Sequence, residues 1–162
     1  MIPVKIVVQL KRLFSKKNAT IEENRQSLED AARLLPNFYF HIRHQPILID
    51  GMEAEWILPN NATNDVMLYL HGGGYISGSH RTHRPMVSRI FKKGNFKGLI
   101  INYRKAPENP YPAAVEDALK AYQYLTKEGY KSENIVLAGD SAGGGLALAL
   151  MYTLRDQKLP LP

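Results

Sequence analysis

Residues 135–143 have the sequence Ile135-Val136-Leu137-Ala138-Gly139-Asp140-Ser141-Ala142-Gly143. The first four are a continuous apolar run, which is typical of a strand buried on both faces. The last five form a G-x-S-x-G pentapeptide, and a helical run begins near Ala142. A strand, a sharp turn and a helix are the context that holds a serine on a strained turn with its hydroxyl exposed. This stretch therefore predicts that Ser141 is a nucleophile.

A glycine-rich loop follows an earlier apolar run. Val66–Leu70 is continuously apolar, and His71-Gly72-Gly73-Gly74 comes directly after it. Consecutive glycines let backbone N–H groups point into a cavity, where they can hold an oxyanion together with the N–H of Ala142. A phosphate-binding loop is the alternative. However, the sequence has no G-x-x-x-x-G-K-[ST] motif, and the spacing does not match G-x-G-x-x-G.

Alternating strand and helix patterns predict an α/β sheet with right-handed crossovers. Apolar runs at Val66–Leu70, 98–101 and 135–138 suit parallel strands buried on both faces. Helical stretches are expected from about His83 to Lys93 and from Pro112 to Gly129. We expect the two motifs to meet at the carboxyl edge of this sheet, where open α/β sheets place their sites.

The region before the parallel strands predicts a helix and a hairpin. Thr20-Ile21-Glu22-Glu23 is a capping box, and its helix is expected to stop at Pro36. Pro46–Asp50 and Met52–Leu58 predict antiparallel strands joined near Gly51. In the second strand the apolar residues alternate with Glu53 and Glu55, which we interpret as a solvent-exposed face rather than an acid/base pair.

Composition limits the possible functions. The 162 residues suit a single globular domain, and the absence of cysteine excludes disulfides and a thiol nucleophile and fits a cytoplasmic location. The net charge is +6, and residues 80–105 hold eight Lys/Arg and no acid. We interpret that stretch as solvated surface, because no nucleic-acid motif accompanies it.

Membrane association is not predicted either. No segment approaches the roughly 20 apolar residues of a membrane span. Residues 1–17 suit either a basic amphipathic segment that touches a membrane or partner, or a terminal helix or cap element, which we favour.

Three motifs in order give the chain a specific resemblance. They are His71-Gly72-Gly73-Gly74-Tyr75, the segment Asn102 to Asp117 with the sequence NYRKAPENPYPAAVED, and Gly139-Asp140-Ser141-Ala142-Gly143-Gly144. Over about residues 65–157 the chain resembles the hormone-sensitive-lipase-like (bacterial family IV) esterases, which have the α/β-hydrolase fold. Asn102 stands where that family commonly has Asp, and Lys105 where it commonly has Leu.

The resemblance implies both a fold and a site. The fold is an α/β-hydrolase fold with a mostly parallel sheet and flanking helices, truncated after the nucleophile helix. Residues 1–40 would be a cap-like helical segment, and residues 41–162 the N-terminal half of the hydrolase domain. Ser141 would be the nucleophile, and Gly73, Gly74 and Ala142 the oxyanion donors. His71, Gly72 and Asp140 would support the loops, and no metal or organic cofactor is implied.

The sequence lacks the other two members of a catalytic triad. In this fold the order is serine, acid, histidine, but Asp156 is the only acid after Ser141 and no histidine follows it. We therefore expect the acid and the histidine to lie outside these residues. His80 and His83 have a spacing that could suit a metal, but without a third ligand nearby we predict none. His41 and His44 are expected on the surface or in the cap.

Three functional hypotheses follow. The first is a serine carboxylic-ester hydrolase that acts on short or medium acyl esters through an acyl-enzyme on Ser141. The second is a non-catalytic, truncated hydrolase-like protein that binds a ligand, itself or a completing chain along an open apolar sheet edge beside the serine strand. The third is amide, peptide or carbamate hydrolysis, or acyl transfer, because a fold does not fix the substrate.

Overall fold

The computed structural model describes residues 19–34 and 41–162. The predictions for residues 1–17 and for the helix stop at Pro36 lie outside the described residues. The division of the chain at residue 40 stays a prediction.

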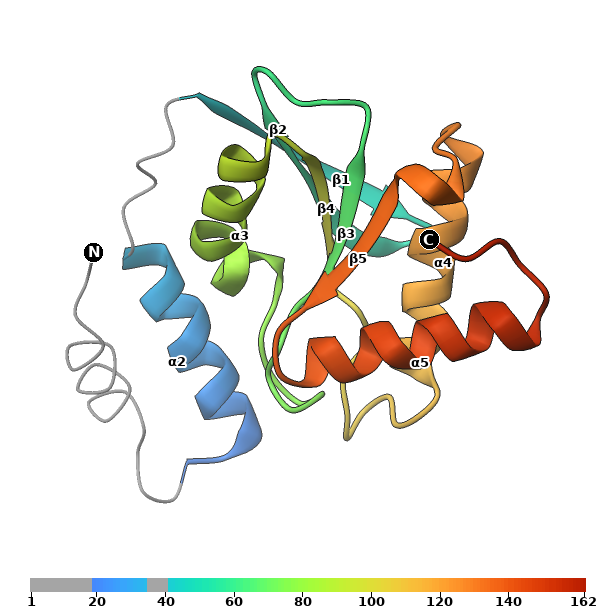
Figure 1. Cartoon of the computed structure of the whole chain (residues 1–162). Helices are drawn as coiled ribbons and strands as arrows, with labels where there is room; N and C mark the ends of the chain where they lie inside the picture. The colour runs from blue at the N-terminus through green and yellow to red at the C-terminus, as the bar shows by residue number, and fades with distance from the viewer. Residues whose placement is uncertain (1–18, 35–40) are drawn as a thin grey trace.

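A sheet of five strands forms the centre of the molecule, in the order β1-β2-β4-β3-β5 (Figure 1). The hairpin pair and the β2–β4 pair are antiparallel, and β3 runs parallel to both β4 and β5. The fold class is thus confirmed as an α/β sheet whose antiparallel entry precedes a parallel part. The strands are β1 (Ile42–Ile49), β2 (Met52–Pro59), β3 (Val66–Leu70), β4 (Lys97–Ile101) and β5 (Ile135–Gly139).

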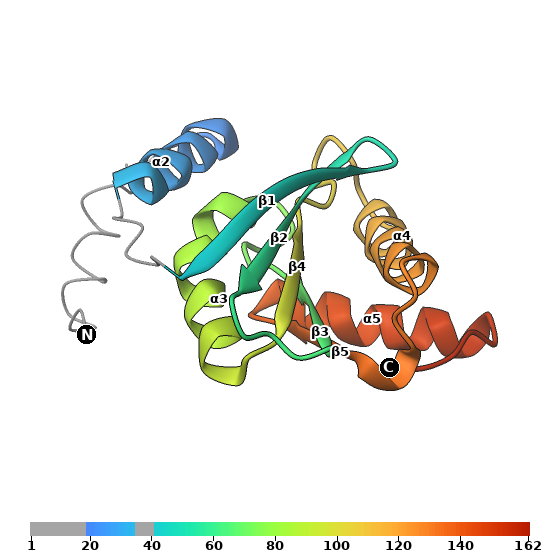
Figure 2. The same ribbon diagram turned by 90° about the horizontal axis from the view of Figure 1, so that it is seen from above.

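Helices cover both faces of the sheet. α3 packs on one face, and α4 and α5 pack on the other, while α2 lies beside α3 at the outside (Figures 1 and 2). The helices are α2 (Ile21–Leu34), α3 (His80–Gly94), α4 (Ala113–Lys127) and α5 (Ala142–Asp156), with a short 3-10 helix at Ser132–Asn134. The capping box of α2 is confirmed, since Thr20 and Glu23 exchange side-chain-to-backbone hydrogen bonds of 2.8 and 3.2 Å.

The core has two layers, one on each face of the sheet. The layer under α4 and α5 is built around Leu68, Leu99 and Tyr122, and the layer under α3 around Ile57 and Phe91. All five residues of β3 are buried, as its continuous apolar run predicts. In β5, however, Val136 is 41% exposed. The burial of β5 on both faces was therefore predicted incorrectly, because β5 is an edge strand among the described residues.

Glu55 corrects the prediction of a solvent-exposed strand face. Glu53 is exposed as expected, but Glu55 is only 1% exposed. The Arg84 guanidinium on α3 donates two hydrogen bonds of 2.7 Å to its carboxylate, and His44 lies 3.7 Å away. The alternation along β2 identified the face correctly, but it could not show that α3 covers that face at Glu55.

Candidate active site

Ser141 lies at the junction of β5 and α5. Its side chain is exposed, and its backbone has φ 51° and ψ −121°, a left-handed conformation that is costly for a residue with a side chain. β5 ends at Gly139 and α5 begins at Ala142. The predicted strand, sharp turn and helix are therefore present, with the serine at the strained position.

The glycine loop lies next to this turn. β3 and β5 are parallel neighbours with Leu70 opposite Gly139, so the loops that follow them leave the sheet at the same edge. Gly73 has φ 129°, and a Cβ there would collide with the carbonyl oxygen of Ser77. A Cβ on Gly143 would collide with the carbonyl oxygen of Leu70. These two positions require glycine, so the close approach of the loop and α5 is built into the sequence.

Three backbone amides at this edge are not used by the fold. Within residues 19–34 and 41–162, the N–H groups of Gly73, Gly74 and Ala142 have no hydrogen-bond acceptor. Ala142 is the first residue of α5, and the first N–H groups of a helix have no partner inside the helix. The same helix end also favours negative charge. This arrangement can stabilise an anion at the mouth of the two loops.

Asp140 ties the two loops together. Its Oδ1 accepts hydrogen bonds from the backbone N–H of Gly72 at 2.9 Å and from the hydroxyl of Tyr69 at 3.0 Å. Nε2 of His83 lies 3.5 Å from the same oxygen. Burial and the charge of Asp140 raise the pKa of Tyr69, which therefore remains a neutral donor. The predicted supporting residues Gly72 and Asp140 are thus in direct contact.

His71 is a buried, neutral part of the loop. Its ring stacks on Tyr103, with centroids 4.2 Å apart and planes at 13°. The Tyr103 hydroxyl donates to the His71 carbonyl at 2.6 Å, and Nδ1 of His71 lies 2.8 Å from the carbonyl oxygen of Gly72. Burial lowers the pKa of His71 to about 3, so the ring is uncharged near neutral pH. This geometry fits the supporting role expected for His71.

Sequence reasoning missed three residues that shape the loop. Tyr69 and His83 contact Asp140, and the His83 ring lies 5.4 Å from that of His71. Arg25 on α2 donates to the carbonyl oxygens of Ile76 at 2.6 Å and Ala106 at 2.7 Å. Strand alternation and helix periodicity give no signal for such contacts, because their partners are distant in the sequence.

His80 and His83 both lie on α3, and the two residues that depart from the common family pattern lie together. Among the described residues, no group of three or more His, Cys, Asp or Glu side chains could hold a metal ion. Lys105 Nζ donates to Asn102 Oδ1 at 2.9 Å, so the two residues that differ from the common family pattern contact each other. They form a pair outside the loop contacts described above.

Asp156 does not serve the serine in this structure. It is exposed at the end of α5 and pairs with Arg155 at 2.8 Å. α5 has 15 residues, so its two ends lie about 22 Å apart. In the described part of the chain, no acid from beyond Ser141 therefore lies at the serine.

Comparison with known proteins identifies the family. The alpha/beta hydrolase fold family matches residues 67–162. This chain belongs to that family. Among its relatives, an acetyl-hydrolase of Streptomyces hygroscopicus is 46% identical over 116 residues, covering 72% of the chain and 39% of the relative. An esterase of Acinetobacter venetianus is 34% identical over 139 residues, covering 85% and 45%.

Solved structures of alpha/beta hydrolases agree with this assignment. An esterase from the bacterial hormone-sensitive lipase family superposes with a TM-score of 0.90 at 39% identity, covering 98% of the chain and 54% of that protein. A structure soaked with p-nitrophenyl butyrate, EstE5, has a TM-score of 0.88 at 37% identity. The resemblance to hormone-sensitive-lipase-like esterases is thus confirmed. The chain spans about two fifths to a little over half the length of these proteins.

None of the helices in the described part of the chain has the length and apolar character needed to cross a membrane.

Proposed function

We propose that this chain supplies the nucleophile and the oxyanion hole of a serine carboxylic-ester hydrolase acting on short or medium acyl esters. The observation that carries the proposal is the strained backbone of Ser141 beside three amides, at the same sheet edge, that have no acceptor among the described residues. The esterase and acetyl-hydrolase relatives support the same reaction class.

In the proposed reaction, Ser141 Oγ attacks the ester carbonyl carbon and loses its proton to a base. The carbonyl oxygen becomes an oxyanion, which the N–H groups of Gly73, Gly74 and Ala142 stabilise. The alcohol leaves with a proton, and water then hydrolyses the acyl-enzyme. We propose that the histidine base and its acid come from outside these 162 residues, because only Asp156 and no histidine follow Ser141.

Hydrolysis of p-nitrophenyl acetate and butyrate tests the proposal. A longer protein that contains this chain should hydrolyse both esters, and Ser141→Ala should reduce kcat by about three orders of magnitude or more. A fluorophosphonate probe should label that protein at Ser141 and leave Ser141→Ala unlabelled. Ester turnover that survives Ser141→Ala would refute the assigned nucleophile. Asp156→Asn is the matched control and should leave turnover unchanged.

We propose as a second candidate that the isolated chain associates through the edge of β5. The supporting observation is a hollow of about 700 Å³ along β5 and α5, lined by apolar residues that include Val136 and Leu148. In this reading the chain binds a second chain rather than turning over ester. The isolated 162 residues would then show no Ser141-dependent turnover but would assemble through the β5 edge.

A further inference from the structure

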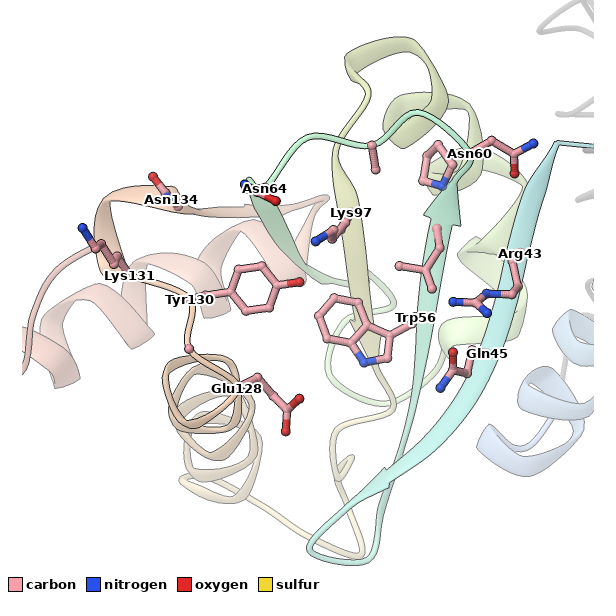
Figure 3. Close-up of a pocket in the computed structure, with 14 residues that line it drawn as sticks. Arg43, Gln45, Trp56, Asn60, Asn64, Lys97, Glu128, Tyr130, Lys131 and Asn134 are labelled. Carbon is pink, nitrogen blue, oxygen red and sulfur yellow. The ribbon is translucent and has the colours of Figure 1, made fainter.

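A second hollow lies at the end of the sheet opposite Ser141. It has a volume of about 750 Å³, which is within the usual range of about 300–1000 Å³ for small-molecule pockets. Its lining includes Asn64 just before β3, Lys97 at the start of β4 and Tyr130 before β5 (Figure 3). Ser141 and the glycine loop follow the other ends of these parallel strands. The hollow is therefore separate from the proposed ester site.

Aromatic rings form the floor of this hollow. Trp56 from β2 and Tyr130 have ring centroids 6.0 Å apart, with planes inclined by 33°. The indole N–H of Trp56 points to the Tyr124 hydroxyl at 3.4 Å, a contact that orients the ring. Trp56 is 8% exposed and Tyr130 is half-buried, so both rings are held by packing. The Tyr130 ring, the more exposed of the two, offers a flat ligand a surface to stack on, with Trp56 next to it.

The charged side chains around the floor favour an anion. Arg43, Lys97 and Lys131 line the hollow against a single carboxylate, Glu128. Lys131 pairs with Glu133 at 3.8 Å, but in the described part of the chain neither Arg43 nor Lys97 has a carboxylate within ion-pair distance. Lys97 Nζ lies 5.5 Å from the centroid of the Tyr130 ring. Two cations thus stand beside the aromatic floor without an anionic partner.

Amide side chains complete the lining. Gln45, Asn60, Asn64 and Asn134 border the hollow, and none of their side chains makes a hydrogen bond to another described residue. Each carries both donors and an acceptor. The fold uses Arg25, Arg84 and Arg104 in ion pairs elsewhere, whereas Arg43, Lys97 and these four amides make no ion pair or side-chain hydrogen bond to a described residue.

We propose that this hollow binds a small planar molecule that carries an anionic group, such as an aromatic or heteroaromatic phosphate. The ring would lie against Trp56 and Tyr130. The anionic group would be held by Arg43 and Lys97, and the amides would contact polar groups on the ring. The relatives described above are named for ester or acetyl hydrolysis and not for a ligand of this kind. The hollow does not include Ser141.

Trp56 makes the proposal directly measurable, because it is the single tryptophan of the sequence. Its indole N–H gives one resolved signal in a ¹H–¹⁵N spectrum of the full chain. The probes are phenyl phosphate and AMP, which carry both a ring and an anion. Inorganic phosphate supplies the anion alone and adenosine the ring alone. All titrations are made at ~150 mM salt, where loose ion attraction is screened.

We expect phenyl phosphate, AMP or both to shift the Trp56 signal in a saturable way. The shift should reach saturation at a lower concentration than with inorganic phosphate or adenosine. Lys97→Met and Arg43→Met should each raise the Kd roughly five-fold or more, because each removes a charge-assisted contact. Glu128→Gln removes the one carboxylate of the lining and should lower the Kd by about two- to three-fold. Lys92→Met on α3 is the matched charge control and should change the Kd by less than about two-fold.

Three results would overturn the proposal. The first is the absence of a saturable shift with both ring-bearing anions. The second is equal binding of phosphate alone, which would mean simple attraction of anions to a basic surface. The third is an equal effect of Lys97→Met and Lys92→Met while the remaining spectrum shows both variants folded. Ser141→Ala should leave binding unchanged, so failure of the ester proposal would not be confused with failure of this one.

Discussion

Single buried residues near the glycine loop should determine how the protein responds to acid. Burial lowers the pKa of His71 to about 3 and also lowers that of His80. In the unfolded chain a histidine titrates near pH ~6.5. At pH values between about 3 and 6.5, His71 is protonated in the unfolded chain but neutral in the folded protein. The corresponding stability is therefore present above about pH 6.5 and is lost as the pH falls towards 3.

We predict that the free energy of unfolding falls between pH 7 and pH 5 by up to about 1.4 kcal/mol per pH unit for each such histidine. Urea unfolding at several pH values measures this slope. His71→Asn should flatten it, whatever its effect on stability at pH 7. His41→Asn replaces a histidine at an exposed position and serves as the control for the substitution itself. If the free energy of unfolding of His71→Asn falls with pH as steeply as that of the unsubstituted protein, His71 is not the source of the slope.

The carboxylate of Glu55 provides a second test at the scale of one residue. Burial acts to raise the pKa of Glu55, but the two hydrogen bonds from Arg84 and the nearby His44 outweigh burial, and the net pKa is lowered. Removing one partner of a buried pair leaves an uncompensated charge, here on Arg84, and costs about 3 kcal/mol. We predict a loss of this size for Glu55→Gln in urea unfolding at pH 7.

Glu53→Gln is the matched control, since Glu53 lies two residues away on the same strand and is exposed. It should change the free energy of unfolding by less than about 0.5 kcal/mol. Equal effects of the two substitutions would show that the Glu55–Arg84 contact adds nothing to stability. Because the pKa of Glu55 is depressed, its contribution should be intact above about pH 4.5 and disappear as the pH falls below that value.

At the scale of elements, α2 depends on one side chain for its attachment to the glycine loop. No residue of α2 is buried, so the helix has little core of its own. Arg25 donates to Glu108 at 2.8 and 2.9 Å and also to the carbonyl oxygens of Ile76 and Ala106. Ala106 in turn donates to the carbonyl oxygen of Tyr75 at 2.9 Å. Arg25 thus links α2 to the two segments that brace the loop.

We predict that Arg25→Met releases α2 while the sheet remains folded. The lost contacts include hydrogen bonds to a charged group, worth about 2 kcal/mol in total at this partly exposed position. Hydrogen exchange at the amides of α2 should therefore accelerate by at least about ten-fold, while exchange in β3 and β4 is unchanged. Arg33→Met is the control, because among the described residues Arg33 forms an ion pair only with Asp30, on the same helix. Unchanged protection of α2 in Arg25→Met would refute this linking role.

Across the whole molecule, the parts predictable from sequence are those set by neighbouring residues. The apolar runs located β3 and β4, the capping box located α2, and the two glycine motifs located the loop after β3 and the turn at Ser141. Contacts between distant residues could not be predicted in this way. The burial of Glu55 depends on Arg84 from α3, and the support of Asp140 depends on Tyr69 and His83. The exposure of Val136 depends on the position of β5 at the edge of the sheet, which no local pattern contains and which was expected only from the resemblance to the esterase family.

The two edges of the sheet differ in how they resist pairing with another chain. β1 carries Pro46 and the charged Arg43, features that disfavour strand addition. β5 has neither proline nor charge, and one of its own residues, Val136, is exposed. On α5, Leu148 is 63% exposed along the same hollow. An uncharged apolar edge of this kind is a template for edge-to-edge association, which the second candidate function requires.

We predict that the isolated chain self-associates through β5. Sedimentation velocity should show an average mass that rises with concentration. Val136→Lys should restore a monomer, because a charge on an edge strand opposes pairing with a second copy. Leu48→Lys introduces the same charge at an exposed position on β1, the opposite edge, and should leave association unchanged. A monomeric chain at all concentrations would remove the second candidate, and equal effects of the two lysines would assign the association to general surface hydrophobicity rather than to β5.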